Sequence, residues 1–482
     1  MRSTLFLLAS TTVVAAQPLP EGAVARIATA PGESRFTGYV AASLSPDGRT
    51  VAIADEDGRL DLWDASGKRL RTLARYGPRG AAPRWSPDGH RLFSGHEKGI
   101  AVWDLDKADD RRILASGLTS SSAPEIVVSP DGKTVVAGWV SPMIVCWDAD
   151  TGAERWRSHS SGGLAMAPGG NHVVRGWFGQ RFDFLDAATG RPVSHFGPEL
   201  FACKPACSDR LALSPDGRYL ACWAEKGVVI LRDARTGEER RRISTGQEFG
   251  IALAFSPDGH WLATGGERYA LNVWEADTGE LVCRRTGHER PLVSVEFAAD
   301  GRRVLTGSGD GTALLWDLDP KVPAPPDQWH ALASADASAV QAALWSLARD
   351  ANGPALLRAN LPPAARLGAE LDHLIADLDA DRHAVRERAS RALADHGRPA
   401  LPALRTALGR PRSAEAATRL EKLIQAVPAD LTTEEIRHRR AVKAMSLAAT
   451  PAACELLSEW AAGAPGAVLT EEARSALDRL HR

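Results

Sequence analysis

The sequence repeats one short turn at regular intervals along its first two thirds. The tetrapeptide Ser-Pro-Asp-Gly begins at Ser45, Ser86, Ser129, Ser214 and Ser256, and the related segments APGG and AADG begin at Ala167 and Ala298. Proline presets the φ angle of the second position of a type I turn, aspartate suits the third, and glycine tolerates the left-handed geometry that follows. Each copy lies between runs of β-branched and aromatic residues, so each is expected to be the corner of a β-hairpin.

The spacing of these corners predicts a repeated sheet. Successive copies begin 38 to 47 residues apart, which is enough chain for four short strands in each repeat. A single four-stranded sheet cannot bury both of its faces, so such repeats stack and each covers its neighbour. We therefore expect seven stacked β-sheets.

A second feature follows each corner after fifteen to twenty residues, where the segments read LWDASG, VWDLDK, CWDADTG, FLDAATG, LRDARTG, VWEADTG and LWDLDP. Its tryptophans are Trp63, Trp103, Trp147, Trp274 and Trp316, and Leu185 and Arg232 replace them in the fourth and fifth repeats. From about Ala23 to Leu318 the chain thus resembles the WD-repeat β-propeller family. The resemblance implies an all-β seven-bladed β-propeller.

The seventh repeat stops after its third strand, at TALLWDLDP. The segment VARIATAPGE, which begins at Val24, is similar to the fourth strands RRRISTGQE and LVCRRTGHE of the two preceding repeats. We expect this N-terminal strand to complete the last blade and close the ring, because closure removes exposed strand edges. The propeller is then expected to span residues 17–318.

The last repeat keeps four polar side chains that the family links by hydrogen bonds within one blade. By resemblance these are His288, Thr306, Asp310 and Trp316. The indole and imidazole N–H groups can donate, while the hydroxyl relays and the carboxylate accepts. A His–Asp pair also occurs in catalytic sites, but the resemblance gives this tetrad a structural role.

The pattern changes after Leu318. A proline-rich segment over residues 319–330 predicts a stiff linker. Residues 331–482 have helical periodicity, which predicts a separate all-α domain. Gly397 is expected to end one helix and Ser413 to begin another, while Thr432 and Thr450 begin two more. The helices suggest hairpins stacked as in HEAT-type repeats, or alternatively a compact bundle.

The first residues, MRSTLFLLASTTVVAAQP, combine a basic start, an apolar run and small residues before Gln17. This pattern predicts a signal peptide over residues 1–16 and an exported mature protein, periplasmic or secreted. No other run is long enough for a transmembrane helix, so no membrane insertion is expected. The 58 basic and 60 acidic residues are well mixed and leave a net charge of −2, which argues against a nucleic-acid partner.

The six cysteines are too few to be a disulfide framework in a chain of 482 residues. Cys146, Cys222 and Cys283 lie in apolar strands and are expected to be core thiols. Cys203 and Cys207 lie close together and form a possible disulfide in an oxidising compartment. The sequence has no nucleophile elbow, Walker loop, HExxH or paired CxxC motif, so we expect no enzyme activity, metal or cofactor.

Three consecutive repeats carry an aromatic residue near one rim of the disc. These residues are Trp139, Trp177 with the adjacent Phe178, and Trp223. One interpretation is an exposed patch that anchors a partner. The other is that the rings fill space where the hydrogen-bonded tetrad has been lost.

These features favour a non-catalytic scaffold for protein–protein interaction, with the propeller rim and the helical region as two surfaces. A rigid ring suits this role, because it holds its loops ready for a partner. The alternative is a propeller that binds a small molecule or a glycan through the aromatic rim.

Overall fold

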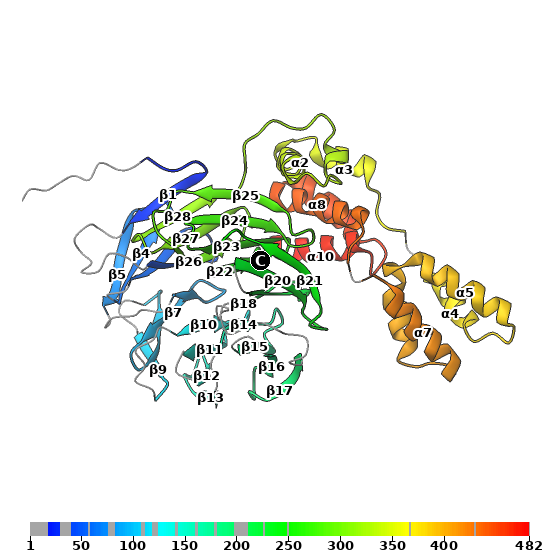
Figure 1. Ribbon diagram of the computed structural model, residues 1–482, viewed down its shortest axis with the longest axis horizontal. Coiled ribbons are helices and arrows are strands. Elements are labelled where there is room, and N and C mark those ends of the chain that lie inside the picture. The colour runs from blue at the N-terminus through cyan, green and yellow to red at the C-terminus, as the bar shows by residue number, and fades with distance from the viewer. Residues whose placement is uncertain are drawn as a thin grey trace, which may run out of the picture.

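The computed structural model describes residues 18–28, 40–55, 58–75, 82–107, 111–117, 124–139, 143–159, 162–177, 181–196, 211–224, 227–247, 250–365, 368–428 and 430–481. These residues form a ring of seven four-stranded sheets with helices on one side (Figure 1). The predicted signal peptide, Phe178, Cys203 and Cys207 lie outside the described residues.

The seven blades follow one another in chain order. Blade one contains β2 (Val40–Leu44), β3 (Thr50–Asp55), β4 (Arg59–Asp64) and β5 (Arg69–Arg75), and blade two contains β6 (Arg84–Trp85), β7 (Arg91–His96), β8 (Gly99–Asp104) and β9 (Arg111–Ala115). Blade three contains β10 (Glu125–Val128), β11 (Thr134–Trp139), β12 (Met143–Asp148) and β13 (Glu154–Ser158), and blade four contains β14 (Leu164–Met166), β15 (His172–Trp177), β16 (Arg181–Asp186) and β17 (Pro192–Phe196). Blade five contains β18 (Leu211–Leu213), β19 (Tyr219–Trp223), β20 (Val228–Asp233) and β21 (Glu239–Ser244), and blade six contains β22 (Gly250–Phe255), β23 (Trp261–Gly266), β24 (Ala270–Glu275) and β25 (Leu281–Thr286).

Blade seven takes its strands from both ends of the propeller. It contains β26 (Leu292–Phe297), β27 (Arg303–Ser308), β28 (Thr312–Asp317) and, as its outer strand, β1 (Ala23–Ala28). β1 pairs antiparallel with β28, with Ala25 opposite Leu315 and Ile27 opposite Ala313. The first strand of the described chain therefore completes the last sheet.

The repeated corners have the turn geometry that their residues favour. At the first corner the Ser45 hydroxyl donates to Asp47 and accepts from the backbone N–H of Thr50, and Gly48 has a φ of 69°. The same serine–aspartate hydrogen bond occurs at the other four Ser-Pro-Asp-Gly corners. Each corner uses one oxygen of its aspartate, so the second oxygen can bind another group.

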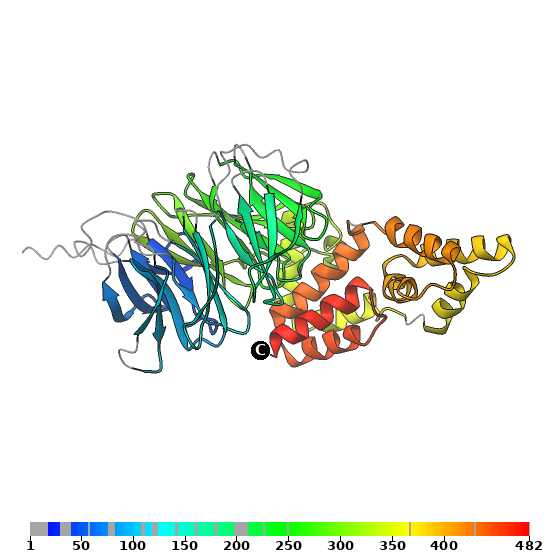
Figure 2. The ribbon, with the colours of Figure 1, turned by 90° about the horizontal axis from the view of Figure 1, so that it is seen from below.

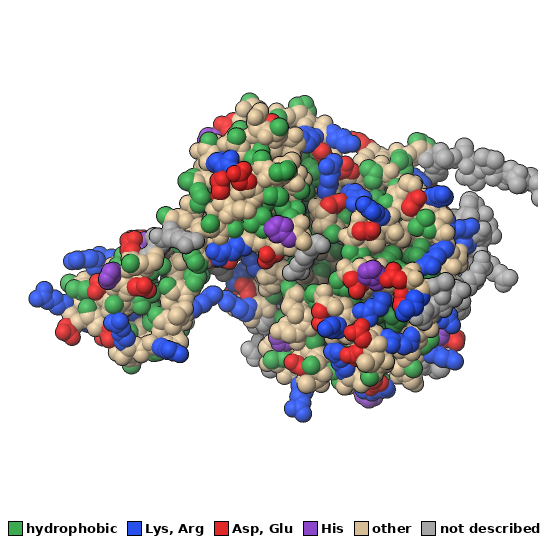
Figure 3. Space-filling model, turned by 180° about the vertical axis from the view of Figure 1, so that it is seen from behind, with side chains coloured by type: hydrophobic (Ala, Val, Ile, Leu, Met, Phe, Trp, Pro, Cys, Tyr) green, Lys and Arg blue, Asp and Glu red, His purple; other side chains and the backbone are tan. Residues whose placement is uncertain are grey.

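The helical region forms two groups (Figures 1 and 2). The docked helices are α1 (Gln328–Ala331), α2 (Ala337–Arg349), α3 (Gly353–Asn360), α8 (Thr433–Ala448), α9 (Pro451–Ala461) and α10 (Val468–Leu480). The distal lobe comprises α4 (Gly368–Asp377), α5 (His383–His396), a 3₁₀ turn (Arg398–Ala400), α6 (Leu401–Leu408) and α7 (Ala414–Ala426). It is inserted between α3 and α8, and it projects from the rest of the molecule (Figure 3).

The predicted helix ends are confirmed. Gly397 follows α5, with a φ of 58°, and Ser413 caps α7 through its hydroxyl. Thr432 and Glu435 form a capping box at the start of α8. Thr450 caps α9, whose first residue is Pro451.

The docked helices share a hydrophobic core with blades six and seven, so the helical region is firmly attached to the propeller. The distal lobe has a separate small core around Leu371, Leu393 and Leu420. The docked helices therefore pack on the propeller through a shared core, whereas the distal lobe packs around its own core.

Candidate interaction surfaces

The predicted tetrad forms a continuous hydrogen-bonded chain inside blade seven. The indole N–H of Trp316 donates to the Thr306 hydroxyl at 2.8 Å, and that hydroxyl lies 2.8 Å from Nε2 of His288. Nδ1 of His288 lies 2.9 Å from the Asp310 carboxylate. Burial alone would raise the pKa of Asp310, but hydrogen bonds from His288 and Thr312 hold that pKa below its ordinary range. The side chains of His288 and Asp310 are 1% and 11% exposed, so the pair is largely enclosed by blade seven.

The prediction of an exposed aromatic rim is wrong for Trp139 and Trp223, which are 3% and 2% exposed. The ring of Trp139 packs edge-on against Trp147, with centroids 6.2 Å apart. The ring of Trp223 lies so close to Gly250 that a Cβ atom there would meet it at 2.1 Å. Trp177 ends β15, and its side chain lies outside the described part of the structure.

The physical reason is the loss of the tetrad in these blades. Blade seven has its relay hydroxyl at Thr306, and the corresponding positions in blades three and five are Ala137 and Cys222. In blade three Trp139, two residues later on the strand, fills the interior instead, and in blade five Trp223, the residue after Cys222, does so. These indoles are core residues.

The surface that the sequence analysis missed lies at the corners of blades five and six. Helix α8 directs three cationic side chains at these corners, namely Arg439, Arg440 and Lys443. Their carboxylate partners in the propeller are Asp216 and Asp258 of two Ser-Pro-Asp-Gly corners and Glu275 and Asp277 of the turn after β24.

Arg439 is the centre of this cluster. Its Nη1 lies 2.5 Å from Oδ2 of Asp277, and its Nε lies 2.7 Å from Oε1 of Glu472 in α10. The Tyr219 hydroxyl donates to the other Asp277 oxygen at 3.0 Å, and His260 lies 3.3 Å from Glu472. Burial would raise the pKa values of Asp277 and Glu472, yet the neighbouring cations lower both to about 2. Asp277 and Glu472 are therefore ionised at neutral pH.

Lys443 and Arg440 bind two carboxylates of blade six directly. The Lys443 ammonium pairs with the Asp258 oxygen that the corner leaves unused, and it lies 4.1 Å from the ring centre of Trp261. Arg440 forms two hydrogen bonds with Glu275, at 2.7 and 2.5 Å, and also donates to the carbonyl of Leu332. These contacts fix one orientation of α8 on the propeller.

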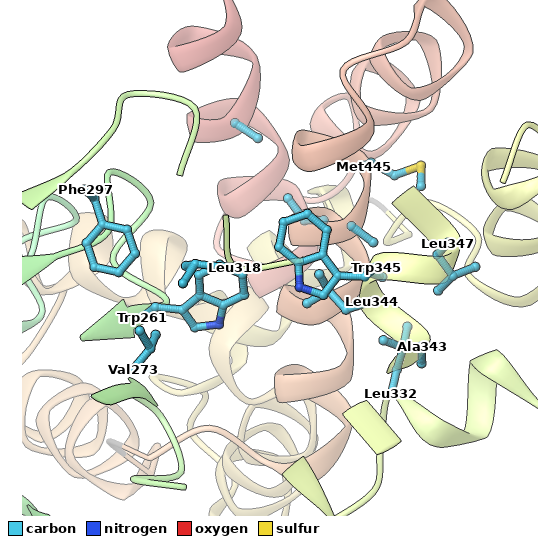
Figure 4. Packing of buried hydrophobic residues seen from close by; sticks show 14 of the residues in the cluster. Trp261, Val273, Phe297, Leu318, Leu332, Ala343, Leu344, Trp345, Leu347 and Met445 are labelled. Carbon is cyan, nitrogen blue, oxygen red and sulfur yellow. The ribbon is translucent and has the colours of Figure 1, made fainter. Parts of the chain in front are cut away.

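Apolar packing surrounds the ionic contacts. Trp261 of blade six and Trp345 of α2 lie with ring centres 6.2 Å apart, and Leu318 lies in the same core (Figure 4). On its other side Trp345 is covered by the guanidinium of Arg302, 5.4 Å away. The indoles supply buried area and the ion pairs set the geometry.

One sequence signal pointed to this interface. Six of the seven repeats have aspartate after the tryptophan position, and only the sixth has glutamate, at Glu275. The longer side chain reaches Arg440. The cationic set at Arg439, Arg440 and Lys443 has the spacing of one helical face, but its partners lie more than 160 residues earlier in the chain.

Comparisons with known proteins agree with this geometry. The family model described as WD domain, G-beta repeat matches residues 239–275 and 279–317, which lie in blades five to seven. The Small ribosomal subunit protein RACK1 of Schizosaccharomyces pombe is 34% identical over 120 residues, 23% of this chain and 38% of that protein. This chain contains a WD40-repeat β-propeller.

Other matches also cover only part of the WD40 propeller. The Meiotic recombination protein rec14 of Schizosaccharomyces pombe is 31% identical over 110 residues, 23% of this chain and 36% of that protein. Protein groucho of Drosophila melanogaster is 32% identical over 115 residues, 23% of this chain and 16% of its own length. The matched part of this chain spans well under half of the length of each of these relatives. A second family model, described as Outer membrane protein assembly factor BamB, matches residues 95–194 in blades two to four.

Among the described residues, no three histidine, cysteine or acidic side chains are placed to share a metal ion. None of the described helices has the length and apolarity needed to cross a membrane.

Proposed function

We propose that this protein is a non-catalytic scaffold for protein–protein interaction, exported after cleavage of its signal peptide. The observation that carries the proposal is the buried ionic cluster between α8 and blades five and six. It fixes the docked helices on a rigid ring in one geometry, so a partner that contacts both meets a surface that is already ordered.

The tetrad supports the non-catalytic part of the proposal. His288 and Asp310 are the pair that most resembles catalytic machinery, and they are enclosed within blade seven and hydrogen-bonded to Thr306 and Thr312. The alternative of a glycan or small-molecule module relied on exposed aromatic residues. The burial of Trp139 and Trp223 removes two of the four aromatic residues on which it relied.

Export is supported by the apolar run and small residues that precede Gln17. The match of residues 95–194 to the model of an outer membrane protein assembly factor is consistent with it. N-terminal sequencing of the protein from cell fractions tests this part. A mature chain that begins near Gln17 in an exported fraction is expected, and an intact Met1 would contradict it.

Site-specific photo-crosslinking of the full chain in its native cells tests the scaffold. Probes that replace Thr236 and Thr406, two exposed residues next to Arg235 and Arg405, should capture specific proteins reproducibly. The exposed Arg191, on blade four, provides the comparison position. If no protein is captured from any position while purified material binds a glycan array, the scaffold proposal is wrong.

A further inference from the structure

A groove of about 350 Å³ separates blade five from the distal lobe. One wall is formed by the corner and the third turn of blade five, at residues 217–219 and 233–236, and by Arg240. The other wall is formed by the lobe and the segment after it, at Arg398, Leu401, Arg405, Ile424, Val427, Pro428 and Asp430. Basic side chains gather around the hollow where the lobe meets the rest of the molecule (Figure 3).

The groove is cationic. Five arginines line it and only two carboxylates do, and both carboxylates already have partners. Asp233 binds Arg240 at 3.0 Å and also accepts backbone N–H groups of its own turn. Asp430 lies 3.3 Å from Arg241, the residue that follows Arg240 on β21.

Three of the five arginines are held by acidic partners. Arg240 binds Asp233, Arg398 binds Glu435 at 2.8 Å, and Arg218 lies 3.4 Å from Asp277. The other two are Arg235 and Arg405, one on each wall. Both are exposed, and neither guanidinium has a hydrogen bond or ion pair within the described residues. Two positive charges thus face the groove without compensation.

The groove also has an apolar strip. Leu401, Ile424 and Val427 of the lobe line the wall between the arginines. A ligand suited to this lining has carboxylates for the two arginines and aliphatic groups for the strip. A short acidic peptide segment has both.

We infer that this groove binds an acidic segment of a protein partner, whose carboxylates pair with Arg235 and Arg405. The inference rests on the proposed scaffold function and names the chemistry of one partner. A lone small anion gains little from exposed arginines, because water and salt screen each pair. A peptide contacts several groups along the groove at once.

The test uses the full chain and a fluorescein-labelled oligo-glutamate peptide that contains leucine, followed by fluorescence anisotropy. The wild-type protein should bind it, more weakly as the salt concentration rises. The double variant Arg235→Glu/Arg405→Glu should bind the peptide at least about tenfold more weakly than the wild type. The matched control Arg191→Glu/Arg388→Glu makes the same charge change at exposed arginines away from the groove and should bind like the wild type.

Three results would overturn the inference. The first is that the groove variant binds the peptide as tightly as the wild type. The second is that the control variant loses as much affinity as the groove variant. The third is that inorganic phosphate or oligothymidylate displaces the labelled peptide at the same concentration as unlabelled peptide does. Thermal unfolding confirms that each variant is folded. If the charge reversal unfolds the protein, Arg235→Gln/Arg405→Gln replaces it and the same outcomes apply.

Crosslinking separates this inference from the scaffold proposal. If the groove variant captures the same partners as the wild type, the acidic-segment inference fails and the scaffold function stands. If neither protein captures a partner, the scaffold proposal itself fails.

Discussion

The guanidinium of Arg439 and the carboxylate of Asp277 meet 2.5 Å apart across the boundary between α8 and blade six. Their side chains are 1% and 5% exposed. A charge so deeply buried is tolerated only while its partners remain in place, because water cannot solvate it. The attachment of the helices to the propeller therefore depends on this pair.

Replacing Arg439 with methionine should destabilise the protein by about 3–5 kcal/mol, because Asp277 and Glu472 would stay buried without their cation. Urea denaturation followed by circular dichroism measures the change. The control Arg388→Met, at an exposed position of α5, should change the free energy of unfolding by no more than about 0.5 kcal/mol. Similar losses in the two variants would show that the ion cluster contributes nothing particular.

Acid should weaken the same interface. The pKa values of Asp277 and Glu472 are about 2 in the folded protein, below their ordinary values of 3.8 and 4.5. Between pH of about 4.5 and 2 the unfolded chain therefore binds protons that the folded chain does not, and stability falls as the pH falls. Thermal unfolding at a series of pH values measures the slope. The double variant Asp277→Asn/Glu472→Gln should have a shallower slope in this window, and an unchanged slope would assign the acid sensitivity to other carboxylates.

The tetrad should contribute to stability and not to binding. Asp310→Ala removes the acceptor of His288 and of the Glu289 backbone N–H. Unpaired buried donors destabilise a protein by about 1–3 kcal/mol. The exposed Asp478→Ala provides the control for denaturation. Loss of crosslinked partners with unchanged stability would instead make Asp310 part of a binding site.

Removing residues 23–28 should destabilise the entire propeller. The deletion leaves blade seven with three strands and opens the backbone edge of β28. A lower unfolding temperature and a tendency to aggregate are expected, as measured by scanning calorimetry and light scattering. Val24→Ala changes an exposed side chain of the same strand and should behave like the wild type. A deletion variant that unfolds at the parent temperature would show that β1 is dispensable.

The ring was predictable because its signals are local and repeated. Ser-Pro-Asp-Gly specifies its own turn through the serine–aspartate hydrogen bond, and its five copies with two related segments set the number of blades. The helix caps at Ser413 and Thr432 are local as well. Short-range chemistry of this kind can be read from one sequence.

The exposure of Trp139 and the partners of Arg439 were not predictable in the same way. A strand-end tryptophan has the same local sequence whether its ring faces solvent or the next blade, and the choice depends on the absent hydroxyl at Ala137. Arg439 meets Asp277 across 162 residues of chain, and no local pattern encodes that distance. Contacts between the repeats and the helices need the three-dimensional structure.

The pairing of β1 with β28 also determines the order in which this molecule can be assembled. Ala25 lies opposite Leu315, so about 290 residues of chain must be synthesised before the first strand finds its neighbour. Contacts between such distant residues form slowly, because the intervening chain must first lose conformational entropy. The strand made first is therefore expected to be among the last to form its hydrogen bonds, and a nascent chain that is stopped before Thr312 lacks the strand with which it pairs.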